Sequence, residues 1–164
     1  HATPEIKCLA YKTLIRPIIE YAKLVWDPYT KNNISNIEKV QRLAARFIFN
    51  KYRHYISPSD LCSQAGLPTL ESRTKQERLK YLYQIIHNQV NIDKSHFFDI
   101  RCNETSRHRH SMFIPAPSVR TDCFKYSYFP RAINDWNSLS NAAVQCTSVE
   151  AFINNISDVL VFPN

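Results

Sequence analysis

The first half of the chain repeats apolar and polar positions with the spacing of amphipathic helices. Residues 9–30 are the most apolar of these stretches, and their long polar side chains recur every three or four positions. That spacing places them on one narrow stripe of a helix, and they are Lys12, Arg16, Glu20, Lys23 and Asp27. Because the remaining circumference is apolar, the pattern predicts a helix that is covered on several sides at the centre of a packed domain.

Proline, glycine and capping residues indicate where the predicted helices bend and end. Pro17 lacks a backbone N–H, but the polar stripe keeps its phase across it, so we expect one kinked helix rather than two unrelated helices. Ser57-Pro58 then begins a short helix that Gly66 ends, and Thr69 caps a long helix to about residue 88.

A further amphipathic helix is predicted over residues 34–50. Its apolar positions follow three-four spacing and comprise Ile37, Val40, Ala44, Phe47 and Ile48. Together these elements predict a helical bundle over about residues 4–90. The positions expected in its core are Leu14, Ile18, Val25, Val40, Phe47, Leu82 and Ile86.

The pattern changes after residue 95. Residues 101–110 are polar and basic and show no period. The alternation of Phe124, Tyr126 and Tyr128 allows a short hairpin. Helices are expected to follow, with Trp136 buried against its own segment or the bundle.

The predicted fold class is mainly α: a helical bundle over residues 1–95, followed by a smaller helical or irregular module over residues 96–164 with room for a short hairpin. Only one glycine, Gly66, occurs among the 164 residues, and hydrophobic residues make up 44% of the chain. A chain of this length can bury a substantial core. The shortage of glycine excludes glycine-rich phosphate-binding loops.

The net charge is +7, and it is unevenly distributed. Residues 1–95 carry 15 Lys/Arg against 8 Asp/Glu, whereas residues 96–164 carry 6 of each. An anionic partner is therefore expected at the first part of the chain. The alternative is a basic, solvated surface without a dedicated partner.

The candidate nucleic-acid-binding residues are the cations that recur on the predicted helices. Three share a helix face opposite the apolar positions of residues 34–50, two continue that face beyond the helix end, and three crowd the first half of the long helix. The set is Lys39, Arg42, Arg46, Lys51, Arg53, Arg73, Lys75 and Arg78. Cations at helical spacing can follow the phosphates of a duplex without reading its bases. A merely solvated helix face has the same pattern.

No catalytic site or cofactor is expected on this chain. No two of its 14 Asp/Glu lie within four positions of each other, so the usual local source of ligands for a two-magnesium site is missing. The motifs Gly-x-Ser-x-Gly, His-Glu-x-x-His and Cys-x-x-Cys are also absent. Four residues have the chemistry of zinc ligands, namely Cys102, His108, His110 and Cys123. Their irregular spacing favours solvated histidines beside a buried thiol, so no metal is expected.

The five cysteines are an odd and widely spaced set, which favours reduced thiols and an intracellular location, either nuclear or cytoplasmic. Neither a signal peptide nor an apolar run of membrane-spanning length is present, so no membrane partner is expected.

Four motifs follow one another along the chain: AYKTLIRPIIEYAKLVWDPYT, IEKVQRLAARFIFNKY, LPTLESRTKQERLKYLYQI and FKYSYFPRAINDWNSL. In this order they resemble the C-terminal part of reverse transcriptases from non-LTR retrotransposons of the jockey-like branch. The resemblance covers about residues 7 to 156. The residues that match the family's wording most closely are Tyr21, Trp26-Asp27-Pro28, Gln41-Arg42, Ala44-Ala45-Arg46, Phe129-Pro130-Arg131 and Trp136-Asn137.

The resemblance implies a thumb-like helical bundle in the first half, which in the family packs on the polymerase palm and holds the primer–template duplex. The second half is similar to the family's C-terminal extension. The family's Tyr-x-Asp-Asp catalytic motif and its endonuclease lie upstream of such a segment, and neither is in this chain. The resemblance therefore implies a non-catalytic fragment of an RNA-directed DNA polymerase that holds primer–template or element RNA without sequence preference.

The parent polymerase's palm is then a further partner, so apolar side chains are expected to be exposed beside the basic face. Two other classes of function remain open from the sequence. One is a protein-interaction module that uses the aromatic-rich second half, and the other is a decayed or repurposed transposon fragment without activity. A helix-turn-helix DNA reader around Gly66 is a weaker alternative.

Overall fold

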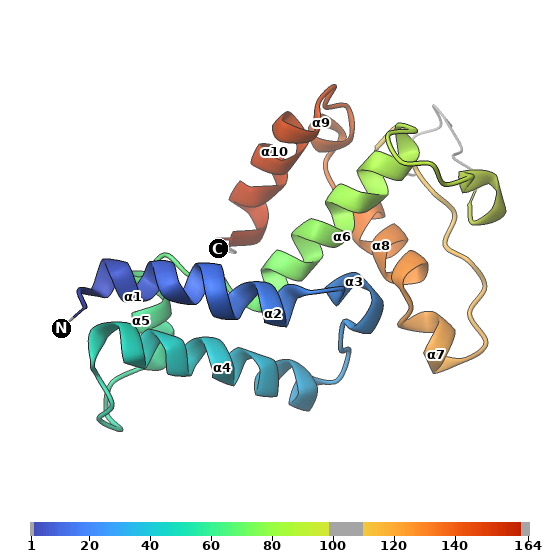
Figure 1. Cartoon of the computed structure of the whole chain (residues 1–164). Coiled ribbons are helices and arrows are strands. Elements are labelled where there is room, and N and C mark those ends of the chain that lie inside the picture. Colours follow the sequence, from blue (N-terminus) through green and yellow to red (C-terminus); the bar gives the residue numbers. More distant parts are fainter. Residues whose placement is uncertain (1, 99–109, 162–164) are drawn as a thin grey trace. The chain divides into compact units, whose positions relative to one another are not determined.

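The computed structural model describes residues 2–98 and 110–161, and this part of the chain is mainly helical, as the sequence predicts (Figure 1). The chain divides into two compact units, residues 1–74 and 75–164. The boundary falls inside the long helix α6 (Leu70–Ile86) rather than after residue 95. The difference arises because the apolar residues of α6 from Leu79 onward belong to the core of the second unit.

The first unit is built around two helical rods that lie side by side and run in opposite directions (Figure 1). One rod consists of α1 (Pro4–Ala10), the π-helical turn η1 (Tyr11–Ile15) and α2 (Arg16–Glu20), and the other is α4 (Lys31–Phe49). The short helix α3 (Lys23–Trp26) connects them, and α5 (Pro58–Gln64) packs against α4.

The wide turn η1 accommodates Pro17 without ending the rod. The backbone N–H of Arg16 donates to the Tyr11 carbonyl, one residue further back than in an α-helix. The rod ends after Glu20, because Ala22 adopts a left-handed conformation with φ 49°. The expectation of one kinked helix through the stretch of residues 9–30 is therefore wrong beyond Glu20.

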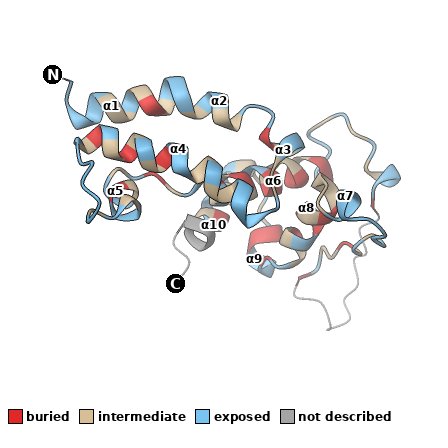
Figure 2. Cartoon of the chain, turned by 90° about the horizontal axis from the view of Figure 1, so that it is seen from below, coloured by how far each residue is buried: buried red, intermediate tan, exposed pale blue. Residues whose placement is uncertain are grey.

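The rod formed by α1, η1 and α2 faces the opposite way from the prediction. Its predicted polar stripe lies on the covered side, because Lys12, Arg16 and Glu20 are half-buried and Glu20 pairs with Arg73 of α6. Several of its apolar residues turn outward, and Leu9, Leu14 and Ile18 are 62%, 67% and 75% exposed. Figure 2 shows pale blue, exposed segments along α1, α2 and α4.

The core predicted for the first unit is consequently wrong at five positions, because Leu14, Ile18, Val25, Val40 and Phe47 are all exposed. The observed core is small and centres on Tyr11, Ile48 and Leu67. The inward face of α4 includes the polar Gln41, whose Oε1 accepts a hydrogen bond from the Tyr11 hydroxyl at 3.1 Å. Polar side chains between two helices can be buried when, as here, they are hydrogen-bonded to each other.

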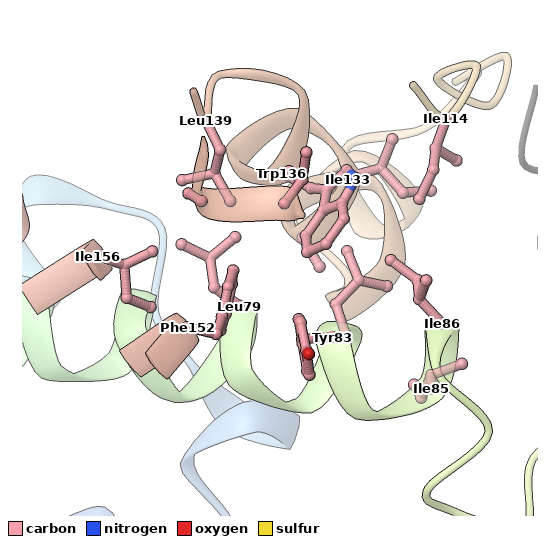
Figure 3. Close-up of a cluster of buried hydrophobic side chains, with 14 of the residues drawn as sticks. Leu79, Tyr83, Ile85, Ile86, Ile114, Ile133, Trp136, Leu139, Phe152 and Ile156 are labelled. Carbon is pink, nitrogen blue, oxygen red and sulfur yellow. The ribbon is translucent and has the colours of Figure 1, made fainter. Parts of the chain in front are cut away.

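The second unit has the larger core, which forms where α6 meets α8 (Tyr128–Asn137) and α10 (Val149–Val161) (Figure 3). Leu82, Ile86 and Trp136 are buried there. The burial predicted for Trp136 is confirmed, whereas Leu82 and Ile86 are buried in the core of the second unit and not, as predicted, in the core of the first bundle. The remaining elements are the 3₁₀ turn η2 (Lys94–His96), α7 (Asp122–Lys125) and α9 (Asn141–Val144).

The hairpin allowed around residues 124–128 is wrong, because this segment is helical. Phe124 lies in α7 and Tyr128 begins α8. The hydroxyl of Thr121 accepts a hydrogen bond from Phe124 N at 3.3 Å, which caps α7 and commits the segment to a helix.

The Trp136-Asn137 pair of α8 holds residues 112–114, at the end of a turn, in place. The Asn137 amide accepts a hydrogen bond from Ile114 N at 3.1 Å and donates one to Ile114 O at 2.7 Å. Trp136 Nε1 donates to Met112 O at 2.9 Å. This motif of the sequence therefore has a structural role in the second unit.

Candidate nucleic-acid interface

The candidate basic face lies on the C-terminal half of α4 and on the loop that follows. Asn50 ends α4 in a left-handed conformation (φ 53°), and Lys51 N then donates to the Arg46 carbonyl at 3.0 Å. This is the usual way in which a helix ends at an asparagine. It directs the chain away from the helix axis and into a loop that projects from the first unit (Figure 1).

Two of the candidate cations lie on the body of α4. Lys39 is exposed, and its Nζ donates to Asn36 Oδ1 at 2.9 Å. Arg42 is half-buried, because its Nη2 donates to the Ser35 carbonyl at 3.1 Å and to the Ser35 hydroxyl at 3.4 Å. Both cations are bonded to neutral groups, so these contacts do not neutralise their charge.

The third cation, Arg46, anchors residues 50–57, which we call the aromatic loop. Its Nη1 donates to the Arg53 carbonyl at 3.2 Å, and its Nη2 donates to the Ile56 carbonyl at 3.3 Å. Ile56 N also donates to the Arg53 carbonyl at 3.1 Å and closes a turn. Arg46 is therefore a positioning residue that ties the loop to α4.

The aromatic loop carries two of the predicted cations and three aromatic side chains that the sequence analysis missed. Tyr52 and Tyr55 are 61% and 68% exposed. Arg53 Nη1 donates to Tyr55 Oη at 3.2 Å, and the His54 ring lies edge-on to the Tyr55 ring with centroids 5.7 Å apart. The interleaving of basic and aromatic residues in KYRHY is the signal that could have identified them.

Carboxylates do not balance the positive charge of this region. The sequence between Glu38 and Asp60 contains neither Asp nor Glu. Within the described part of the chain, no ion pair involves its five cations, Lys39, Arg42, Arg46, Lys51 and Arg53. The first unit as a whole carries 11 Lys/Arg against 6 Asp/Glu, a balance of +5. Such a surface attracts polyanions.

Arg73, in contrast, has a carboxylate partner. Its Nη2 donates to Glu20 Oε2 at 2.9 Å, and its Nε contacts the other oxygen of the same carboxylate. Burial raises the pKa of Glu20, but the hydrogen bond and charge of Arg73 outweigh it, so the pKa is lowered overall. The charge of Arg73 is thus compensated within the first unit.

Arg78 and Lys75 share a carboxylate partner in the second unit. Arg78 is only 7% exposed, and its Nε and Nη2 donate to Asp135 Oδ2 at 2.9 and 2.5 Å. Lys75 Nζ lies 3.4 Å from Asp135 Oδ1. The structure therefore separates the eight candidate cations into five without a carboxylate partner and three in ion pairs, to which we assign a structural role.

A buried lysine joins α3 to the beginning of α6. Lys23 is 8% exposed, and its Nζ donates to the Leu70 carbonyl at 2.6 Å. Burial lowers its pKa, and the nearby Glu20 and Asp27 oppose that effect. At the same helix end, Glu38 Oε1 accepts a hydrogen bond from Glu71 N at 3.1 Å, where a carboxylate also interacts favourably with the helix dipole. These contacts fix where α6 begins.

Exposed apolar side chains lie beside the basic face, as the sequence predicts for a thumb-like unit. Val40, Leu43 and Phe47 follow helical spacing on α4 and are 40%, 64% and 50% exposed. We call these three residues the exposed α4 stripe. The Nζ of Lys7, from α1, lies 4.9 Å from the centroid of the Phe47 ring, so a cation borders the stripe.

The zinc candidates are not brought together in the described structure. Cys102 and His108 lie outside the described residues. His110 is buried, with its Nε2 3.0 Å from the Trp136 carbonyl, and Cys123 is exposed. Across residues 2–98 and 110–161, no group of three or more His, Cys, Asp or Glu side chains is placed to hold a metal ion.

Comparison with known proteins gives no relative for this chain: no family model matches it, and neither a curated protein nor a solved structure does. Within the described residues, no helix has both the length and the apolar character needed to cross a membrane.

Proposed function

We propose that this chain is a non-catalytic part of a retrotransposon reverse transcriptase and that it holds nucleic acid without sequence preference. The ligand is RNA or an RNA–DNA duplex, and the contacts are made by the cations of α4 and of the aromatic loop. One observation carries the proposal: five cations between Lys39 and Arg53 lie in a region without a carboxylate, either in the sequence or in the described ion pairs. The motif resemblance is the reason for naming RNA or an RNA–DNA duplex as the ligand.

The five cations divide into direct contacts and supporting residues. Lys39, Lys51 and Arg53 are exposed, so they can reach phosphates without rearrangement. Arg42 and Arg46 already bond carbonyl groups, so they add positive potential and hold the surface in shape. Point charges of this kind position a duplex through its backbone and leave the bases unread.

The salt dependence of binding tests this proposal. The affinity falls as salt rises, and each phosphate contact that is lost makes the slope of log affinity against log salt less steep by about 0.9 on a B-form duplex. The double variant Lys39→Ala, Lys51→Ala should therefore lower the slope by about 1.8 and weaken binding to unrelated duplex sequences alike. Fluorescence anisotropy with two labelled duplexes measures both effects.

Lys125→Ala provides the control, because Lys125 is an exposed lysine of α7 in the second unit. It should leave the slope unchanged. If the folded double variant and the wild type have equal slopes, the basic face is only a solvated helix surface and the proposal is wrong.

The exposed α4 stripe favours a second candidate function, which is docking to a protein. The stripe is apolar, and the cations of α4 and Lys7 border it. The complementary surface therefore has an apolar centre and an acidic rim, since a second copy of this unit would bring its own charge of +5 against the first. In the family that the motifs resemble, the expected occupant is the polymerase palm.

Isothermal titration calorimetry of the chain with a purified palm of a jockey-like reverse transcriptase tests this second function, because binding releases heat. The variant Leu43→Glu, Phe47→Glu should abolish heat release, whereas Val119→Glu, at an exposed valine of the second unit, should not. Absence of binding to the palm, together with a concentration-dependent dimer that the double variant loses, would assign the stripe to self-association instead.

A further inference from the structure

We infer that the aromatic loop is a stacking site for unpaired bases, so that the chain prefers a duplex that continues into a single strand over a blunt duplex. This inference rests on the proposed function and specifies its ligand: a junction between paired and unpaired nucleic acid. The cations hold the backbone, and the rings of Tyr52 and Tyr55 hold bases.

The first support is the exposure of the two rings. Tyr52 and Tyr55 are 61% and 68% exposed, and neither belongs to the hydrophobic clusters formed by the described residues. The fold therefore does not use these rings for its own packing. Every base offers an aromatic face to such a ring, so stacking is strong and tolerates any sequence.

The second support is that the loop is already shaped in the absence of a ligand. Arg46 holds the carbonyls of Arg53 and Ile56, and Asn50 caps the preceding helix. At the far end, the hydroxyl of Ser57 accepts a hydrogen bond from Asp60 N at 3.3 Å and caps α5. A loop fixed at both ends loses less conformational freedom on binding than a mobile one does.

The third support is the position of the charges within the loop. Lys51 and Arg53 alternate with the tyrosines, and Arg53 Nη1 is hydrogen-bonded to Tyr55 Oη at 3.2 Å. A guanidinium is therefore fixed beside a ring, where the phosphate of a stacked nucleotide would lie. Cations that follow the backbone and aromatic rings that receive the bases are the two components of sequence-tolerant single-strand binding.

A phosphate-only interface would not need the rings. Cations alone bind any nucleic-acid backbone, and a blunt duplex presents its phosphates while its bases remain stacked inside the helix. Exposed tyrosines contribute only where bases are available. The inference therefore predicts a difference between two probes that carry the same duplex and differ only in an unpaired extension.

The experiment compares the affinity of the full chain for a blunt duplex with that for the same duplex bearing an unpaired 3′ extension of mixed sequence. The wild type should bind the extended probe more tightly. Loss of one stacked base costs about 5- to 150-fold in affinity. The variant Tyr52→Ala, Tyr55→Ala should lose the preference by such a factor while its affinity for the blunt duplex and its salt slope stay unchanged.

Two matched variants distinguish stacking from other effects. Tyr52→Phe, Tyr55→Phe keeps the rings and should keep the preference. Tyr21→Ala removes a tyrosine that is 79% exposed elsewhere in the first unit and should also keep it. Photo-crosslinking from 5-iodouridine in the extension should label Tyr52 or Tyr55.

The outcomes separate this inference from the proposed function. Binding with a steep salt slope but without preference for the extension overturns the stacking site alone. Loss of the preference in Tyr21→Ala, or in the phenylalanine variant, also overturns it, because the rings of the loop would then not be its cause. No binding to either probe overturns the proposed function and the stacking site together.

Discussion

Replacing Arg78 by methionine tests whether the ion-paired cations of α6 are structural. Arg78 is 7% exposed and donates two hydrogen bonds to Asp135 Oδ2. Methionine keeps much of the apolar length of the side chain but removes the charge. The change leaves the Asp135 carboxylate, whose side chain is 20% exposed, in an ion pair with Lys75, whose Nζ lies 3.4 Å from Asp135 Oδ1.

The expected loss of stability follows from this geometry. Breaking a buried ion pair by removing one partner costs about 3–5 kcal/mol. The partial exposure of Asp135 and the remaining contact with Lys75 reduce that cost, so we expect about 2–3 kcal/mol for Arg78→Met. Replacing both partners, as Arg78→Met with Asp135→Leu, should recover most of the loss, since a well-packed apolar pair is often as stable as the buried ion pair.

Urea unfolding followed by tryptophan fluorescence measures these differences. A Trp26→Phe background leaves the fully buried Trp136 as the reporter of the second unit. With a urea dependence of about 1–3 kcal/mol per molar, the midpoint should fall by roughly 0.7–3 M in Arg78→Met. Its salt slope for duplex binding should remain that of the wild type.

The opposite pair of results would refute the structural role. If Arg78→Met unfolds at the wild-type midpoint and lowers the salt slope by about 0.9, Arg78 contacts phosphate and the ion pair with Asp135 is incidental.

Three further predictions follow from the fold and the site. Leu82→Ala should cost about 2–5 kcal/mol of stability, whereas Leu14→Ala, at an exposed position, should change it by less than about 0.5 kcal/mol, both measured by urea unfolding followed by far-UV circular dichroism, which reports on the helices of both units; equal costs would contradict the outward orientation of Leu14. Burial raises the pKa of Glu20, but Arg73 lowers it by more, so this pair stabilises the fold above the unfolded carboxyl pKa of about 4.3, and the stabilisation is lost as the pH falls through the lower folded value. Glu20→Gln should therefore be less stable than the wild type at neutral pH and lose less stability on acidification, as measured by urea unfolding at both pH values; parallel losses would refute this account. The chain alone should extend no primer with magnesium or manganese, and incorporation that depends on one of its carboxylates would overturn the proposed non-catalytic role.

Helical periodicity predicted the elements of the first unit better than their orientation. The spacing of Lys12, Arg16 and Glu20 correctly places these residues on one side of a helix, but the pattern does not say which side is covered. That depends on partners distant in sequence, such as Arg73 for Glu20 and Gln41 for Tyr11. In the second unit, Leu82 and Trp136 lie among further buried apolar residues such as Leu79 and Ile133, so the same reasoning placed their side chains inside correctly.

The candidate interface shows the same limit. The sequence identifies every cation but not its partner, so Arg46 and Arg78 look alike in the sequence. In the structure Arg46 anchors the aromatic loop through two carbonyls, and Arg78 is buried against Asp135. Charge at helical spacing does not single out the tyrosines of the loop, although the sequence KYRHY interleaves them with cations.

The central claim is that the position of the cations, rather than their number, creates the binding surface. The most direct measurement compares the salt slope of duplex binding for two double variants of equal net charge: Lys39→Ala, Lys51→Ala in the first unit, and Lys80→Ala, Lys125→Ala in the second. The account predicts a slope lowered by about 1.8 in the first variant and unchanged in the second. Equal reductions in both variants would show that total charge alone governs binding and would contradict the account.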